Sequence, residues 1–437
     1  MPRLPITKLC PGLALSTILV FASASAAPSE PTLPAPIESE VWITLGADAF
    51  ATIQGERLLD SPPPRLADNS GVVLSRVRQS DLPRISGRLH EVHRRCSGFM
   101  THPSKAVGLE ALAAATRQQP FGPSPYSIDE PAAVQGVASR LSGNSILATI
   151  TSLSTLFNNR YHAHPSGVAA AQWIHDLWAG YAFGRGDVTV ELVTHPGVNQ
   201  PSVVLTIQGV TLPDEYIVLG AHLDSIASGS SNPNFSAPGA DDDASGIASL
   251  SNVIQAAMLD GFRPARTVQF MGYAAEEVGL VGSQDIANSY QSAGVDVVAA
   301  FQLDMTAYNG SAPDIGLIGD FTDPTLTSFL EDLLDTYQPS AVWNHTACGY
   351  ACSDHASWNN AGYPAAFAFE SLVGQHNPTI HTTSDVTATF GDTGDHALKF
   401  ARLAAAFMVE TAKSGDVEIF SDGFESGSTD AWSLTVP

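Results

Sequence analysis

The residues EYIVLGAH (215–222) are a short, mostly apolar run that ends on a histidine. A continuous apolar run of this length is typical of a strand buried inside a parallel sheet. The later stretch ASGIASLSNVIQAAMLDG (244–261) has the length and spacing of a helix that stops at Gly261. A buried strand followed by a helix is the repeating unit of α/β proteins.

The same two patterns recur through the second half of the chain. We expect further buried strands at TVQFMGYA (267–274), VVAAFQLD (297–304) and PAAFAFE (364–370), and further helices at residues 168–182 and 395–412. Alternating strands and helices favour layers of helix packed on a sheet. We therefore predict an α/β fold with a mixed, mostly parallel central sheet flanked by helices.

Composition limits the possible classes of protein. The chain has 437 residues, of which 44% are hydrophobic, so it can bury a sizeable core and is neither mainly disordered nor fibrous. Its 20 Lys and Arg side chains stand against 44 Asp and Glu side chains, which gives a formal net charge of −24. Such an acidic chain repels phosphate backbones, so we expect no nucleic-acid partner.

The N-terminus has the parts of a secretory signal peptide. Arg3 and Lys8 supply positive charge, residues 12–22 are apolar, and the small residues up to Ala26 suit a signal peptidase. A membrane span needs ~20 apolar residues, which neither this stretch nor any later one reaches. We therefore expect cleavage after Ala26, no membrane association, and a protein secreted to the extracellular space or the periplasm.

The part of the chain before residue 126 has a different composition from the rest. After a Pro-rich linker it carries the strand-like runs VWITLGA (41–47) and GVVLSRV (71–77), followed by a polar helical stretch near residues 89–100. The Pro, Gly and Ser residues of TRQQPFGPSPYS (116–127) indicate an exposed, protease-accessible connection.

These changes divide the chain into four expected parts. They are a signal peptide (1–26), an N-terminal segment (27–125), the main domain (126–416) and an acidic, Gly/Ser-rich tail (417–437).

Acids and histidines gather where the expected strands end. They are His222, Asp224, Asp241, Asp242, Asp243, Glu276, Glu277, Asp304 and His381. Sites in open α/β sheets form at the carboxyl ends of the strands, so we expect these side chains to face one crevice. Imidazole and carboxylate ligands without a thiolate suit Zn²⁺ or a similar first-row ion, whereas Ca²⁺ prefers oxygens alone. Carboxylates this close repel one another unless cations lie between them, and two ions that share a carboxylate suit hydrolysis.

The cysteines indicate one disulfide. Cys348 and Cys352 are near neighbours, and such a pair is a disulfide candidate in an oxidising compartment. Cys10 belongs to the expected signal peptide, and Cys96 stands alone in the N-terminal segment. A zinc ribbon would need a second close pair, which the sequence lacks.

Six motifs resemble the bacterial leucyl aminopeptidases of the M28 family of di-zinc peptidases. They are HLDS (222–225), APGADDDASG (237–246), AAEEVGLVGS (274–283), QLDMTAY (302–308), CGYACSDHASW (348–358) and IHTTSD (380–385). The resemblance spans roughly residues 126–412 and implies the zinc-peptidase fold. VWITLGADA (41–49) and HEVHRRCSGFMTHPS (90–104) are similar to the pro-segments of these enzymes. This likeness implies that residues 27–125 are a small α+β pro-segment, removed by a cut near Tyr126.

The resemblance implies two Zn²⁺ ions per chain. His222 and Asp304 would bind one ion, Glu277 and His381 would bind the other, and Asp242 would bridge the two.

The resemblance also implies the catalytic groups. Glu276 would act as general base and acid on a metal-bridging water, and Tyr350 would donate a hydrogen bond to the oxyanion. Asp224 would accept the second ring N–H of His222. The Asp242–Asp243 peptide bond would be cis.

The implied substrates are peptides with a free N-terminus and a large apolar first residue such as Leu. Met305, Phe367, Phe369, Ile380 and the disulfide of Cys348 and Cys352 would line the pocket for that residue. Phe367, Val373 and His376 depart from the commonest family pattern. How strongly the pocket prefers Leu over Phe or Met is therefore open. We expect a monomer, with the pro-segment inhibiting the enzyme in cis.

Several alternatives remain open at this point. The same scaffold serves carboxypeptidases and glutaminyl cyclases, and a degenerate member would be a binding module. Residues 27–125 could instead be an independent accessory domain.

Asp241 and Asp243 suit loop and helix N-cap positions better than metal positions. Ser353, Asp354 and His355 cannot form a catalytic triad, because residues adjacent in sequence do not converge in that geometry.

Overall fold

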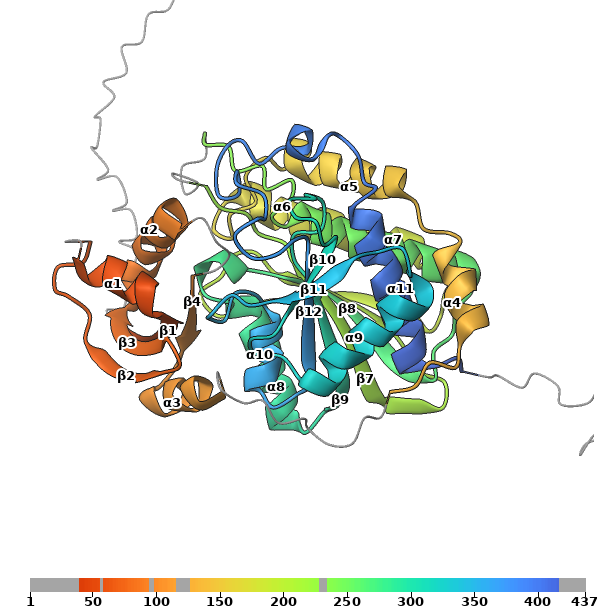
Figure 1. Cartoon of the computed structure of the whole chain (residues 1–437), viewed down its shortest axis with the longest axis horizontal. Helices are drawn as coiled ribbons and strands as arrows, with labels where there is room; N and C mark the ends of the chain where they lie inside the picture. The colour runs from red at the N-terminus through yellow and green to blue at the C-terminus, as the bar shows by residue number, and fades with distance from the viewer. Residues whose placement is uncertain (1–38, 56–57, 94–97, 115–125, 228–233, 416–437) are drawn as a thin grey trace, which may run out of the picture. The chain divides into compact units, whose positions relative to one another are not determined.

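Two β-sheets organise the chain in its computed structural model (Figure 1). The structure describes residues 39–55, 58–93, 98–114, 126–227 and 234–415. Both sheets belong to one compact unit, Glu38–Pro437. The predicted signal peptide, the C-terminal tail, Cys10 and Cys96 lie outside the described residues.

The larger sheet has eight strands in the order β11-β10-β12-β9-β7-β8-β6-β5. They are β5 (Val188–Val193), β6 (Ser202–Ile207), β7 (Leu212–His222), β8 (Arg266–Tyr273), β9 (Asp296–Leu303), β10 (Ile315–Ile318), β11 (Trp343–Thr346) and β12 (Ala365–Phe369). β7 pairs in parallel with β8 and β9, β9 pairs in parallel with β12, and β10 pairs in parallel with β11. The other pairings, β10 with β12, β6 with β8 and β5 with β6, are antiparallel. The predicted mixed, mostly parallel sheet is confirmed.

Helices flank this sheet, as expected. They are α4 (Pro131–Ala138), α5 (Gly143–Leu156), α6 (Pro165–Tyr181), α7 (Ala244–Asp260), α8 (Val281–Ala293), α9 (Pro324–Tyr337), α10 (His355–Asn360) and α11 (Ala397–Ala412). The strands and helices that we predicted from residue 168 onward are all present, with shifts at their ends. The predicted stop of α7 is also confirmed, since Gly261 follows it with a φ of 77°, a left-handed conformation that glycine adopts without strain.

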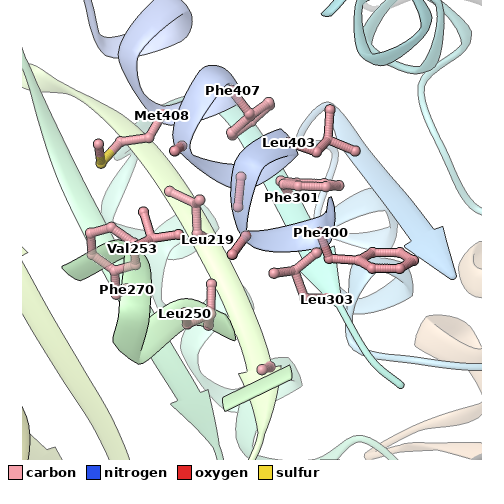
Figure 2. Packing of buried hydrophobic residues seen from close by; sticks show 14 of the residues in the cluster. Leu219, Leu250, Val253, Phe270, Phe301, Leu303, Phe400, Leu403, Phe407 and Met408 are labelled. Atoms are coloured by element: carbon pink, nitrogen blue, oxygen red, sulfur yellow. The ribbon is translucent and has the colours of Figure 1, made fainter. Parts of the chain in front are cut away.

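Side chains of the central strand β7 alternate between two apolar clusters. Ile217 and Leu219 pack in one cluster with residues of α7 and α11, and Val218 packs in the other with residues of α8 and α10. Figure 1 shows these two pairs of helices on opposite faces of the sheet, and Figure 2 shows Leu219 and Phe301 of the strands facing Phe407 of α11. Because both faces are covered, the strand is apolar at successive positions instead of at every second one.

The smaller sheet is antiparallel, with strand order β2-β3-β1-β4. Its elements are β1 (Glu40–Gly46), α1 (Ala47–Gly55), β2 (Arg65–Asn69), β3 (Val72–Arg78), α2 (Leu82–His93), β4 (Phe99–His102) and α3 (Lys105–Ala114). The strands predicted at residues 41–47 and 71–77 are β1 and β3. The predicted α+β character of the N-terminal segment is therefore confirmed.

The prediction of a helix near residues 89–100 is partly wrong. The helix α2 begins earlier and ends at His93, whereas Phe99 and Met100 lie in β4 and pair with β1. Both side chains are buried in this strand. Pairing with a strand more than 50 residues earlier decides their conformation, and local helix propensity does not report such a contact.

None of the helices in the described ranges is long and apolar enough to cross a membrane.

Replacing Phe407 by Ala should destabilise the main sheet and its helices. The Phe407 ring is fully buried and lies 4.9 Å, between centroids, from the Phe301 ring. Removing a buried aromatic side chain leaves a cavity and typically costs about 3–5 kcal/mol. The matched control is Phe183→Ala, because Phe183 is 92% exposed. Urea unfolding should show a large loss for the first variant and almost none for the second; equal losses would contradict this assignment of the core.

Candidate metal centre

Three neighbouring parallel strands bring the predicted residues to one edge of the larger sheet. His222 is the last residue of β7, Asp304 directly follows β9, and Glu276 and Glu277 lie in the short helix η2 (Glu276–Val278) just after β8. Asp242 precedes α7, and His381 lies in the loop after β12. The structure thus brings together all the metal ligands that the resemblance implied.

The two imidazoles lie on opposite sides of Asp242. His222 Nε2 is 3.0 Å from Asp242 Oδ1, and His381 Nε2 is 2.8 Å from Asp242 Oδ2. His222 Nε2 is also 3.6 Å from Asp304 Oδ1, and His381 Nε2 is 3.4 Å from Glu277 Oε2. Each oxygen of Asp242 therefore faces a separate pair of a histidine and a carboxylate, which is the arrangement of a bridging carboxylate between two ions.

These spacings fit ligands of a common cation. Two ligand atoms at 2.0–2.1 Å from a tetrahedral ion lie about 3.3 Å apart. The His222–Asp304 and His381–Glu277 separations are close to that value. His222, Asp242 and Glu277 also form a group whose ligand atoms lie within 4.8 Å of one another.

The carboxylates of this cluster lack ordinary hydrogen-bond partners. Both side-chain oxygens of Asp242, Glu276, Glu277 and Asp304 are buried and accept no well-formed hydrogen bond from any described residue. An unsatisfied buried charge is strongly destabilising unless a counter-charge is present. Bound cations supply that counter-charge, and a mixture of imidazole and carboxylate suits a zinc-type ion.

The proton affinities of the side chains reflect the same crowding. Burial raises the pKa of Glu277 to about 7, against the opposing charge of His381. Burial alone would lower the pKa of His381, but the charges of Glu277 and Asp242 outweigh it and raise that pKa to about 10. Burial also raises the pKa of Glu276 well above its usual value, opposed by His222 and reinforced by Glu277. A carboxyl group with a raised pKa is suited to accept a proton near neutral pH.

A second set of buried carboxylates is hydrogen-bonded to backbone N–H groups. Asp243 accepts from Gly246 (2.8 Å) as the N-cap of α7, and also from His222 (3.0 Å) and Met305 (3.0 Å) at the ends of β7 and β9. Asp241 accepts from Ala307 (3.0 Å). The prediction that Asp241 and Asp243 hold the loop and cap the helix is confirmed.

Asp224 has a contact that sequence reasoning missed. Its Oδ1 lies 3.5 Å from His222 Nδ1, the neighbour we expected, but its oxygens also accept the backbone N–H groups of Glu276 (3.0 Å) and Glu277 (3.2 Å). Asp224 therefore fixes the turn that carries both glutamates. Asp385, the last residue of the motif IHTTSD, accepts in the same way from Asp241 (3.1 Å) and Asp242 (3.1 Å).

A small apolar pocket adjoins the metal cluster. It encloses about 80 Å³ and is lined by Cys348, Tyr350, Cys352, Phe367, Phe369, Val373 and His376. Met305 and Ile380 pack in the same apolar cluster, and each is adjacent in sequence to a residue of the metal centre. The predicted disulfide between Cys348 and Cys352 is present in the pocket wall. Outside the pocket, the Asp242–Asp243 peptide bond is cis, as expected. The structure thus gathers the predicted pocket residues beside the metal cluster.

Ser353, Asp354 and His355 do not form a triad. Asp354 Oδ2 accepts a hydrogen bond from Gln302 Nε2 (3.2 Å), and His355 Nε2 lies 3.0 Å from the backbone oxygen of Asp320. All three side chains are buried.

Known proteins share this sequence pattern and fold. The pattern of peptidase family M28 matches residues 202–408, a range that contains the whole metal cluster. A probable leucine aminopeptidase of Arthroderma benhamiae is 39% identical over 292 residues, which are 66% of this chain and 78% of the relative. The LapA aminopeptidase of Legionella pneumophila has a TM-score of 0.72 at 28% identity, covering 87% of this chain and 100% of that chain. A glutaminyl cyclase of Fimbriiglobus ruber shares the fold, with a TM-score of 0.51 at 16% identity over 61% of this chain and 94% of that chain.

These findings define the class of the protein as a peptidase-type hydrolase with a mixed α/β sheet. The chain belongs to peptidase family M28. The expected family is therefore confirmed, but the restriction to its bacterial members is not supported, because curated relatives at 37–39% identity are fungal leucine aminopeptidases.

Removing bound metal should destabilise the protein. Without cations, the buried carboxylates of this cluster repel one another, and a ligand present at 100 times its Kd stabilises a protein by about 3 kcal/mol. Dialysis against a chelator should therefore lower the midpoint of thermal unfolding, and added Zn²⁺ should restore it. Ca²⁺ is the control and should restore little, because the centre contains imidazole. An unchanged midpoint after metal removal would contradict the metal centre.

Proposed function

We propose that the protein is a secreted, zinc-dependent aminopeptidase. It hydrolyses the N-terminal peptide bond of peptides and prefers large apolar first residues such as Leu. The observation that carries the proposal is the placement of Asp242 between two histidine–carboxylate pairs. The similarity to named leucine aminopeptidases supports the same activity.

In this proposal the chain binds two zinc ions. His222 and Asp304 hold one, Glu277 and His381 hold the other, and Asp242 is shared between them. When bound, the ions polarise the scissile carbonyl and lower the pKa of the attacking water. The side chains have the ligand spacing that this requires, because the backbone contacts of Asp243, Asp224 and Asp385 hold the loops in place.

Glu276 is the proposed general base and acid. It takes a proton from the attacking water and returns it to the departing amine, and such transfers typically contribute 10²–10⁴-fold in rate. Its raised pKa, which results chiefly from burial, suits a group that must hold a proton during part of the cycle. Tyr350, buried in the pocket wall, is the proposed hydrogen-bond donor to the oxyanion.

The apolar pocket is the proposed site for the first side chain of the peptide. Met305 and Ile380 belong to the same apolar cluster as the pocket wall. They are the sequence neighbours of Asp304 and His381. A side chain in the pocket would therefore place its own α-amino group and carbonyl close to the metal ligands. Among the described residues, no Lys or Arg lines the pocket, which disfavours a carboxypeptidase, because that reaction needs a cation to hold the substrate carboxylate.

The N-terminal part of the chain has a proposed role in maturation. We infer that residues 1–26 are removed on secretion, and that residues 27–125 inhibit the enzyme in cis until the chain is cut near Tyr126. The tight contact between α2 and the metal cluster supports inhibition over an independent accessory domain. The mature enzyme is proposed to act as a monomer.

A free N-terminus should be essential for turnover. The mature, zinc-loaded protein should cleave a leucyl chromogenic amide rapidly and leave the N-acetylated amide untouched, because the amine must bind close to the ions. Equal cleavage of both amides would replace the proposal with an endopeptidase or amidase. Cyclisation of an N-terminal glutamine substrate in place of hydrolysis would favour the glutaminyl cyclase alternative.

Replacing Glu276 by Gln should abolish most of the activity and leave the metal bound. The substitution keeps the shape of the side chain but removes its ability to accept a proton, so kcat should fall about 10²–10⁴-fold. Glu191→Gln is the matched control, because Glu191 is exposed on β5. Zinc content is measured in both proteins. Retained activity in the Glu276 variant would remove this residue from the proposed mechanism.

A further inference from the structure

The helix α2 of the N-terminal segment is anchored directly on the turn that carries Glu277. Ser86 Oγ donates a hydrogen bond of 2.6 Å to the backbone oxygen of Glu277, and both groups are buried. Next to this contact, Thr101 of β4 donates its backbone N–H to the oxygen of Gly279 (3.3 Å). These bonds connect residues more than 170 positions apart and fix the helix against the metal centre.

His90 follows Ser86 by one helical turn, so the two side chains lie on the same face of α2. Its side chain is only 3% exposed. His90 Nε2 lies 3.4 Å from Glu277 Oε2, and its ring centroid lies 4.1 Å from that of His381. The helix therefore directs one imidazole into the metal centre.

The distances match those of the ligands already assigned. Glu277 Oε2 is 3.4 Å from His381 Nε2 and also 3.4 Å from His90 Nε2. Ligand atoms around a tetrahedral zinc-type ion lie about 3.3 Å apart. His90, Glu277 and His381 are also a group whose ligand atoms all lie within 4.8 Å of one another, as expected for three ligands of one ion.

We propose that His90 is a further ligand of the metal ion held by Glu277 and His381, as long as the N-terminal segment is attached. This inference rests on the metal centre of the proposed function and adds a residue to it. In the uncut chain that ion would have His90, Glu277, His381 and Asp242 as ligands, which completes a tetrahedral set. Structural zinc sites have four protein ligands, whereas catalytic sites leave one position for water or substrate.

Removal of the N-terminal segment would then change the chemistry of the ion as well as opening the crevice. Loss of His90 leaves three protein ligands and one position for water or the substrate amine. The inhibitory segment would act by occupying one coordination position of the ion. A segment that merely covered the site would leave the ligands of the ion unchanged.

The test compares uncut full-length chains loaded with Co²⁺, whose visible absorption reports coordination number. The variant is His90→Gln, and the control is His93→Gln on the same helix. His93 lies near its own segment, with Nδ1 3.7 Å from Asp48 Oδ2 and Nε2 2.9 Å from Thr52 Oγ1. We expect His90→Gln to weaken the strong absorption of four-coordinate cobalt and to accelerate Zn²⁺ release to a chelator about tenfold or more, whereas His93→Gln should match the unaltered chain.

A second measurement does not depend on how the variant folds. The unaltered chain loaded with Co²⁺ is cut in the connection before Tyr126, and the N-terminal segment is separated. The spectrum of the remaining cobalt-loaded domain should change in the same direction as the spectrum of the His90→Gln variant. Unchanged spectra and release rates, in both the variant and the cut protein, would overturn the role of His90 and leave the proposed function intact. Failure of every form to bind cobalt would overturn the metal centre itself, and with it both proposals.

Discussion

The arrangement of buried negative charge at one edge of the larger sheet is the constraint on which the rest of the structure depends. Carboxylates that follow β7, β8 and β9 and that precede α7 converge there because parallel strands end on the same side of a sheet. Burying so many like charges is unfavourable unless each is compensated. The chain compensates one set with backbone N–H groups, and in the proposed function cations compensate the other set.

The division between the two sets is visible in single residues. Asp243 accepts three backbone hydrogen bonds and ties β7, β9 and α7 together, whereas both oxygens of the adjacent Asp242 face imidazoles. Asp224 holds the amides of Glu276 and Glu277 and so aims their side chains at the crevice. The carboxylates with backbone partners thus position the carboxylates without them.

The N-terminal sheet brings a further contact to the same edge. Its helix α2 contacts Glu277 through Ser86 and places His90 beside His381. Separation of the segment would take the His90 imidazole away from the cluster and leave those of His222 and His381 in place. Maturation by proteolysis would then act on the ligands of an ion, and not on the fold of the larger sheet, whose core is formed by α7, α11 and their strands.

The class of fold could be predicted from the sequence alone, and so could the set of acids and histidines that the structure gathers at one edge of the sheet. Apolar runs such as residues 215–222 predict strands because both faces of the sheet are covered, and the motifs around them point to the metal-ligand candidates. The motifs separated the expected role of Asp242 from those of Asp241 and Asp243, but local pattern did not give the distant backbone partners of the latter two, such as Ala307 and Met305. It also missed the strand at Phe99 and the contact of His90 with Glu277. These depend on pairing between segments far apart in the chain, which only the tertiary structure decides.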